Sequence, residues 1–145
     1  MPSLLFIDPQ TGEQLYYDEL LNGVCAGSID YAPWVQPSTH CEAVRALLTA
    51  VVLGQPLTFF DSDFSVVERE SLGGTAVRLA ERIRLPGGSR SDFDAMRSKA
   101  LQQTGFALTL FTSGTTGRPK QVTHDVEGLT RMLKVSVVHE SNVWG

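Results

Sequence analysis

The stretch from Phe106 to Lys120 constrains this chain more than any other part of its sequence. An apolar, β-prone run at 106–111 leads directly into a segment of glycines, hydroxyl side chains and two cations. Glycine adopts backbone angles that a Cβ forbids, so the amides of such a segment can converge on one point. Converging amides, hydroxyls and positive charge suit a polyphosphate, and each hydrogen bond to a charged phosphate oxygen contributes roughly 1.5–3 kcal/mol. The stretch therefore predicts a strand that opens into a phosphate-binding loop.

The spacing of the glycines excludes the ordinary P-loop. That motif has four residues between its glycines, and a Lys-Ser or Lys-Thr pair follows the second glycine. Here two threonines separate Gly114 from Gly117, and Arg118 and Pro119 precede Lys120. The short string Ser-Gly-Thr-Thr-Gly is by itself also typical of a hairpin turn, so its interpretation depends on the longer string around it.

The ten residues 111–120, Phe-Thr-Ser-Gly-Thr-Thr-Gly-Arg-Pro-Lys, resemble the phosphate-loop signature of the adenylate-forming superfamily. This family includes acyl- and aryl-CoA synthetases, peptide-synthetase adenylation domains and luciferases. Its loop holds the β- and γ-phosphates of ATP while a carboxylic acid attacks the α-phosphate, and a thiol of coenzyme A or an acyl-carrier protein then takes the acyl group. The resemblance implies that the loop positions the leaving pyrophosphate and neutralises its charge, with no proton transfer. The residues it assigns to the phosphates, none of them catalytic or metal-ligating, are Thr112, Ser113, Gly114, Thr115, Thr116, Gly117 and Lys120.

The resemblance also implies that most of the active site lies beyond this chain. In the family the adenine, ribose and Mg²⁺ contacts and a catalytic lysine come further downstream, and only residues 121–145 follow the loop here. We therefore expect 1–145 to be a single partial domain, the N-terminal portion of the large N-terminal domain of an ATP- and Mg²⁺-dependent ligase. Alone it should be inactive, and it should tend to self-associate.

Two alternatives stay open beside the ligase fragment. In the first, the chain is a stand-alone, non-catalytic module that binds phosphate or a partner. In the second, it is one half of a split enzyme. The apolar Val-Trp pair at 143–144 favours the fragment, because an evolved domain end is expected to be polar. Fatty, aryl and amino acids all fit the resemblance as substrates, and the short N-terminal region favours a free-standing acyl- or aryl-acid ligase.

The amino-acid composition excludes some classes of binding partner. With 42% apolar and 19% charged residues the sequence is typical of a globular domain. Its net charge of −4 argues against a general binder of nucleic acid or anionic membranes. No apolar run reaches the ~18 residues of a membrane span. Cys25 and Cys41 lack metal-type spacing, so we expect two reduced thiols in a cytoplasmic protein.

Strands and helices alternate along the chain, which predicts the α/β class with a mixed sheet and packed helices. A hairpin is expected at 4–17 around a turn at 8–12, followed by a helix start at 17–21 that Asn22 and Gly23 interrupt. The segment 75–85 fits a strand or a helix, and we favour the strand. Further strands are expected at 31–35, 57–60, 106–111 and 121–123, and further helices at 64–72, after Ser91 or Asp92, and after Asp125.

The clearest expected helix ends at Leu53. Thr39 and Glu42 fit a capping box at its start, and Gly54 is its C-terminal stop. We expect this helix to be nearly buried, because its polar residues form one narrow stripe. These polar residues are Glu42, Arg45 and Thr49.

For three further residues we expect ordinary structural roles in packing or capping rather than roles in ligand binding. Trp34 is expected to pack in the interior rather than form a ligand platform, and His124 to have a packing or surface role. Gly105 is expected to cap the C-terminus of the helix before it.

Overall fold

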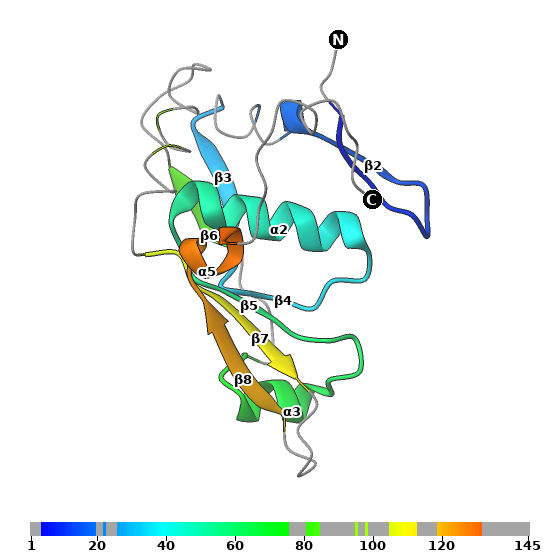
Figure 1. Cartoon of the computed structure of the whole chain (residues 1–145), viewed down its shortest axis with the longest axis vertical. Coiled ribbons are helices and arrows are strands. Elements are labelled where there is room, and N and C mark those ends of the chain that lie inside the picture. The colour runs from blue at the N-terminus through cyan, green and yellow to red at the C-terminus, as the bar shows by residue number, and fades with distance from the viewer. Residues whose placement is uncertain are drawn as a thin grey trace.

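The computed structural model describes residues 4–19, 22, 26–75, 81–84, 95, 98, 105–112 and 119–131. The described part is mixed α/β, as the alternation predicted (Figure 1). Its elements are β1 (Leu4–Ile7), β2 (Gln14–Tyr16), β3 (Ser28–Tyr31), β4 (Trp34–Val35), α2 (His40–Leu53), β5 (Leu57–Phe59), α3 (Val66–Ser71), β6 (Glu81–Arg84), β7 (Leu108–Thr112), β8 (Lys120–His124) and α5 (Val126–Thr130). None of the helices in these residues has the length and apolar character needed to cross a bilayer.

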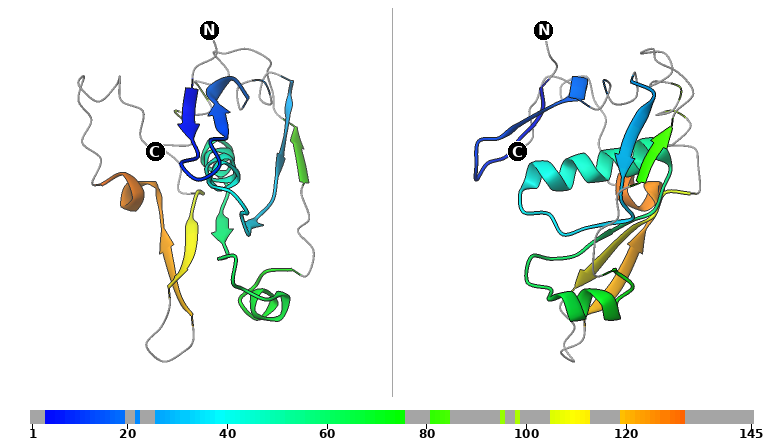
Figure 2. Two further views of the ribbon diagram at one scale, coloured as in Figure 1. Left: turned by 90° about the vertical axis from the view of Figure 1, so that its right-hand side faces the viewer. Right: turned by 180° about the vertical axis from the view of Figure 1, so that it is seen from behind.

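A four-stranded mixed sheet is the centre of the fold. Its strand order is β4-β5-β7-β8; the first three strands run parallel and β8 is antiparallel to β7. Helix α2 lies between this sheet and a second layer that contains the β1–β2 hairpin and the β3–β6 pair (Figures 1 and 2). The core lies between α2 and the sheet, and α5 contributes to it through Val126 and Leu129. Its buried residues are Tyr31, Val35, Ala50, Leu57, Phe106 and Leu108.

The strand expected at 31–35 is wrong as a single element. Tyr31 ends β3, which pairs with β6, whereas Trp34 begins β4 in the four-stranded sheet. Pro33 lies between them and has no N–H to donate, so neither ladder can run through it. Its carbonyl instead accepts from the amide of Thr58, 3.0 Å away. The proline therefore marks the place where the chain changes sheets.

Helix α2 has the predicted bounds, but its capping box is not reciprocal. Thr39 Oγ1 accepts from the Glu42 amide at 3.1 Å, and Gly54 ends the helix in the left-handed region with φ 63°. The Glu42 carboxylate bonds the amide of Ser38, one residue before the N-cap, at 2.9 Å. The expectation of near-complete burial is wrong, because most residues of the helix, including most of its apolar ones, are only half-buried. The buried residues of α2 are Cys41, Thr49, Ala50 and Val52.

Other boundaries differ by a few residues. Helix α3 begins two residues later than expected, because Ser65 is its N-cap and forms a full capping box with Glu68. Strand β7 begins later than 106 and extends to Thr112, and β8 is longer than 121–123 at both ends. Near the N-terminus residues 17–19 are helical, and Asn22, expected to interrupt the helix, is helical as well.

Some of the segments for which the sequence predicted structure lie outside the described residues. These are 76–80 of the ambiguous segment and most of the helix after Ser91 or Asp92, of which Ala95 and Ser98 are described and helical. Strand β6 confirms the strand interpretation for the described part of 75–85. Gly105 lacks the positive φ of a left-handed cap, and the end of the helix expected before it lies outside the described residues. Among the described glycines a positive φ occurs at Gly12, Gly27, Gly54 and Gly73.

Gly105 is needed for a close approach between two backbones. A Cβ at this position would lie 2.5 Å from the carbonyl oxygen of Gly54, the C-cap of α2. The next residues enter the sheet, where the carbonyl of Ala107 accepts from the Leu57 amide at 2.8 Å. The missing side chain therefore lets the end of α2 sit against the start of β7.

Asp8 joins the N-terminal hairpin to α2. Its side chain is 1% exposed, and its Oδ1 accepts from the amides of Gln10 at 2.8 Å and Thr11 at 3.2 Å. Its Oδ2 accepts from the backbone amide of His40, the first residue of α2, at 3.0 Å, and His40 Nδ1 lies 3.2 Å from Oδ1. Burial raises the pKa of this carboxyl, but the hydrogen bonds from these amides and from His40 outweigh it and lower the pKa to about 2.

Replacement of Gly105 by alanine should destabilise the protein. The added methyl group forces two backbones apart, and overpacking of this kind costs about 1–3 kcal/mol. Urea denaturation of Gly105→Ala measures the loss. A free energy of unfolding within about 0.5 kcal/mol of the parent protein would contradict the close approach.

The contribution of Asp8 to stability should vanish in acid. Its pKa is about 2 in the folded state against an ordinary value of 3.8, so the unfolded chain binds more protons between these values. The contribution is therefore fully present above the ordinary pKa and is lost as the pH falls towards 2. Denaturation midpoints of the parent protein and Asp8→Asn should differ clearly at neutral pH and converge in this window. A gap that does not change with pH would contradict the ionised anchor.

Candidate functional site

The structure places the two described residues of the predicted phosphate loop opposite each other. Thr112 is the last residue of β7 and Lys120 is the first residue of β8, and the two are register partners in the antiparallel pair. Both are exposed. The other predicted contacts, Ser113, Gly114, Thr115, Thr116 and Gly117, lie outside the described residues. The chain therefore leaves and re-enters the sheet at one point, with a hydroxyl and an ammonium group beside it.

Backbone pairing along the whole of β7 and β8 fixes this point. Leu108 pairs with His124 at the far end of the two strands, and the register continues without a bulge to Thr112 and Lys120. Two side chains add to the pairing. Thr109 Oγ1 lies 3.2 Å from Thr123 Oγ1, and Thr112 Oγ1 is 3.4 Å from the carbonyl oxygen of Lys120. The second contact is long for a hydroxyl donor, so a phosphate oxygen can compete for this hydroxyl.

Aromatic packing supports the end of β7. Phe111, next to Thr112, stacks on Phe60 with ring centroids 5.3 Å apart and an interplanar angle of 14°. Phe64 lies 5.7 Å from the same ring. Phe60 follows β5 and Phe64 precedes α3, so the β5–α3 connection forms the floor under the start of the loop. Offset and edge contacts of this kind contribute about 0.5–1.5 kcal/mol each beyond burial.

Trp34 extends this cluster and is a packing residue, as expected. It is 8% exposed and lies edge-on to Phe60, with centroids 5.8 Å apart. Its Nε1 donates to Thr75 Oγ1 at 3.1 Å. The guanidinium carbon of Arg69 lies 4.8 Å from the centre of its ring. Sequence motifs do not single out Arg69 or the two phenylalanines; the run Thr-Phe-Phe at 58–60 is the one signal of an aromatic floor.

The turn after β8 is fixed by a local cap. Asp125 Oδ1 accepts from the Gly128 amide at 2.6 Å, which starts α5 where the sequence predicted. His124 ends β8 and is half-buried next to this cap. Within the described residues, no group of three or more His, Cys, Asp or Glu side chains is arranged to hold a cation.

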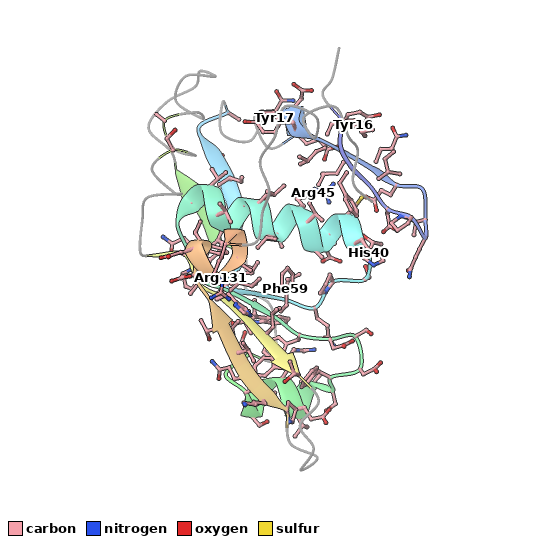
Figure 3. The ribbon with its side chains drawn as sticks, in the orientation of Figure 1. Tyr16, Tyr17, His40, Arg45, Phe59 and Arg131 are labelled. Atoms are coloured by element: carbon pink, nitrogen blue, oxygen red, sulfur yellow. The ribbon has the colours of Figure 1, made fainter. Side chains whose placement is uncertain are left out.

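A cavity of about 660 Å³ lies beside α2 and is lined by residues of α2, β3 and β4, Trp34 among them. Among the described residues, its charged lining consists of Glu13, Glu19, Asp30, Glu42 and Arg45. Arg45 rises from α2 (Figure 3), and its Nη2 lies 3.1 Å from Glu19 Oε2. Of the residues predicted to bind phosphate, the two that the structure describes, Thr112 and Lys120, do not line this cavity. An excess of carboxylates makes it unsuited to a polyphosphate.

No protein-family model matches the sequence, and no solved structure matches it significantly. Over 116 residues, 80% of the chain, the sequence is 29% identical to cyclosporin synthetase simA of Tolypocladium inflatum. The chain spans about 1% of the length of that protein. It is therefore distantly similar to a small part of a synthetase.

Loss of the Phe111 ring should destabilise the β7–β8 pair. Phe111 is half-buried, so truncation should cost about 2–3 kcal/mol, below the 3–5 kcal/mol of a fully buried phenylalanine. Urea denaturation of Phe111→Ala measures this change. The matched control is Gln121→Ala, because Gln121 is the exposed register partner of Phe111. Equal, small effects of the two substitutions would contradict the aromatic floor.

Proposed function

We propose that this chain is the phosphate-gripping part of an adenylate-forming acid–thiol ligase. Its segment 112–120 would hold the β- and γ-phosphates of ATP, and the leaving pyrophosphate, while a carboxylic acid is activated as its acyl-adenylate. A thiol of coenzyme A or of a carrier protein would then accept the acyl group. The remaining contacts to ATP and Mg²⁺ would come from a longer protein or a second chain.

The observation that carries this proposal is the pairing of Thr112 with Lys120, two residues of the ten-residue signature, at adjacent strand ends. A polyphosphate needs donors and positive charge held in one place, and charge-assisted hydrogen bonds are about twice as strong as neutral ones. The exposed ammonium of Lys120 and the hydroxyl of Thr112 are brought together by the strand register. The floor of phenylalanines gives this pair a rigid base, which is how positioning contributes to phosphoryl chemistry.

The similarity to cyclosporin synthetase supports the proposal at the level of a synthetase. It covers 80% of the chain and so extends well beyond the signature. In the described part, the residues that we assign to the nucleotide are Thr112 and Lys120, and both would contact its phosphates. We assign no proton transfer to any of them, because their role is to bind and neutralise charge.

Removal of the Lys120 ammonium should weaken pyrophosphate binding. One charge-assisted hydrogen bond is lost, so the Kd of the 145-residue chain for inorganic pyrophosphate should rise at least about tenfold in Lys120→Ala. The shifts of the Thr112 and residue 120 amides in ¹H–¹⁵N NMR spectra follow the titration.

Arg131→Ala is the matched control for net charge. Arg131 is an exposed cation at the end of α5 (Figure 3), and its loss changes the charge of the chain by the same amount. Binding should be unaffected by this substitution. If Lys120→Ala and Arg131→Ala weaken binding equally, pyrophosphate is attracted by overall charge and the assigned contact is wrong.

A further inference from the structure

The side-chain amide of Gln36 ties together two segments that are distant in the sequence. Gln36 follows β4, and its Nε2 donates to the carbonyl oxygens of Asp61 at 2.7 Å, Ser62 at 3.2 Å and Phe64 at 2.9 Å. These three carbonyls belong to the connection between β5 and α3. One amide group therefore holds the backbone of this connection in place.

Arg69 fixes the orientation of that amide. Its Nη1 donates to Gln36 Oε1. A guanidinium group can only donate hydrogen bonds, so the oxygen of Gln36 must face Arg69 and its NH₂ group must face the three carbonyls. Without Arg69 the amide could turn over and present its oxygen to the carbonyls.

Burial of the Arg69 guanidinium group costs free energy, which the hydrogen bond to Gln36 helps to offset. The residue is 8% exposed, and its Nε has no hydrogen-bond acceptor. The ion pairs of the described residues, His40 with Asp8 and Arg45 with Glu19, do not include it. A buried cation without a carboxylate is expensive, and the ring of Trp34 offsets part of this cost.

The connection held by Gln36 packs against Phe111, next to the described end of β7. Phe64 is one of the residues whose carbonyls Gln36 bonds and Phe60 directly precedes them, and both rings pack on Phe111. Phe111 directly precedes Thr112, which is paired with Lys120. A continuous series of contacts therefore leads from Arg69 through Gln36 and the aromatic floor to the two groups assigned to phosphate.

We propose that Gln36 and Arg69 are positioning residues for the phosphate loop. Arg69 orients the Gln36 amide, the amide holds the β5–α3 connection, and the phenylalanines of that connection set the place at which Thr112 and Lys120 present their polar groups. This inference rests on the proposed function, because it concerns the same polyphosphate site. It adds two residues that lie outside the signature at 111–120.

Gln36→Glu separates this role from simple charge balance. A glutamate gives the buried Arg69 a carboxylate partner, but it removes the NH₂ group and turns an oxygen towards three carbonyls. The Kd for inorganic pyrophosphate should rise about tenfold, and the amide signals of Phe111 and Thr112 should shift. Arg69→Met should have the same effect, and Arg69→Lys, which keeps a donor, a smaller one.

Two control variants distinguish positioning from a general loss of stability. Val67→Ala changes a 74% exposed residue of α3 and should leave Kd unchanged. Leu15→Ala removes a fully buried side chain of the β1–β2 hairpin, so it should lower Tm without changing Kd below Tm. Each variant is measured at a temperature at which its NMR spectrum is that of a folded chain. If Gln36→Glu does not fold, Arg69→Lys replaces it as the test of the positioning role.

The outcomes separate the two proposals. A Kd that stays at the parent value in Gln36→Glu and in both Arg69 variants, while Lys120→Ala weakens binding, overturns the positioning role alone. The positioning role is also overturned if Kd rises in every variant, Leu15→Ala included, in proportion to its loss of Tm. If Lys120→Ala itself leaves Kd unchanged, the proposed function fails.

Discussion

The stacking of Phe111 on Phe60 is the contact on which the candidate site depends. Strand pairing sets the register of β7 and β8, so that Thr112 and Lys120 face each other. It does not by itself fix the free end of a two-stranded extension, because a hairpin alone is only marginally stable in water. The rings at 60 and 64 hold this end against the β5–α3 connection. The rigidity of the loop base therefore comes from a segment about 50 residues earlier in the sequence.

Charge is distributed unevenly over the described residues. Four carboxylates line the cavity between the helix and the outer layer, and the Asp8 anchor adds a buried one at the start of the helix. The exposed cation Lys120 lies at the loop end of the β7–β8 pair, and Arg69 is buried against the ring of Trp34. Under the proposed function a polyphosphate would be disfavoured beside the carboxylates and favoured at Lys120, although the chain as a whole carries a net charge of −4.

Local signals in the sequence predicted local structure well. The start and end of α2 follow from Thr39 and Gly54, which act on neighbouring backbone groups. Features that depend on distant contacts were missed. Gly105 is required by the carbonyl of Gly54, and Gln36 has no motif because its carbonyl partners lie 25–28 residues away. For the site, the predicted strand ends at 111 and 121 differ by one residue from the observed ends at Thr112 and Lys120, whereas its aromatic floor required the fold.

A titration of the ¹⁵N-labelled chain with inorganic pyrophosphate tests the central claim most directly. The account predicts saturable shifts of amide signals at the facing ends of β7 and β8, with the largest changes at Thr112 and Lys120, and no change around Arg45 in the acidic cavity. Shifts that centre on the cavity, or signals that do not move at the strand ends, would contradict it.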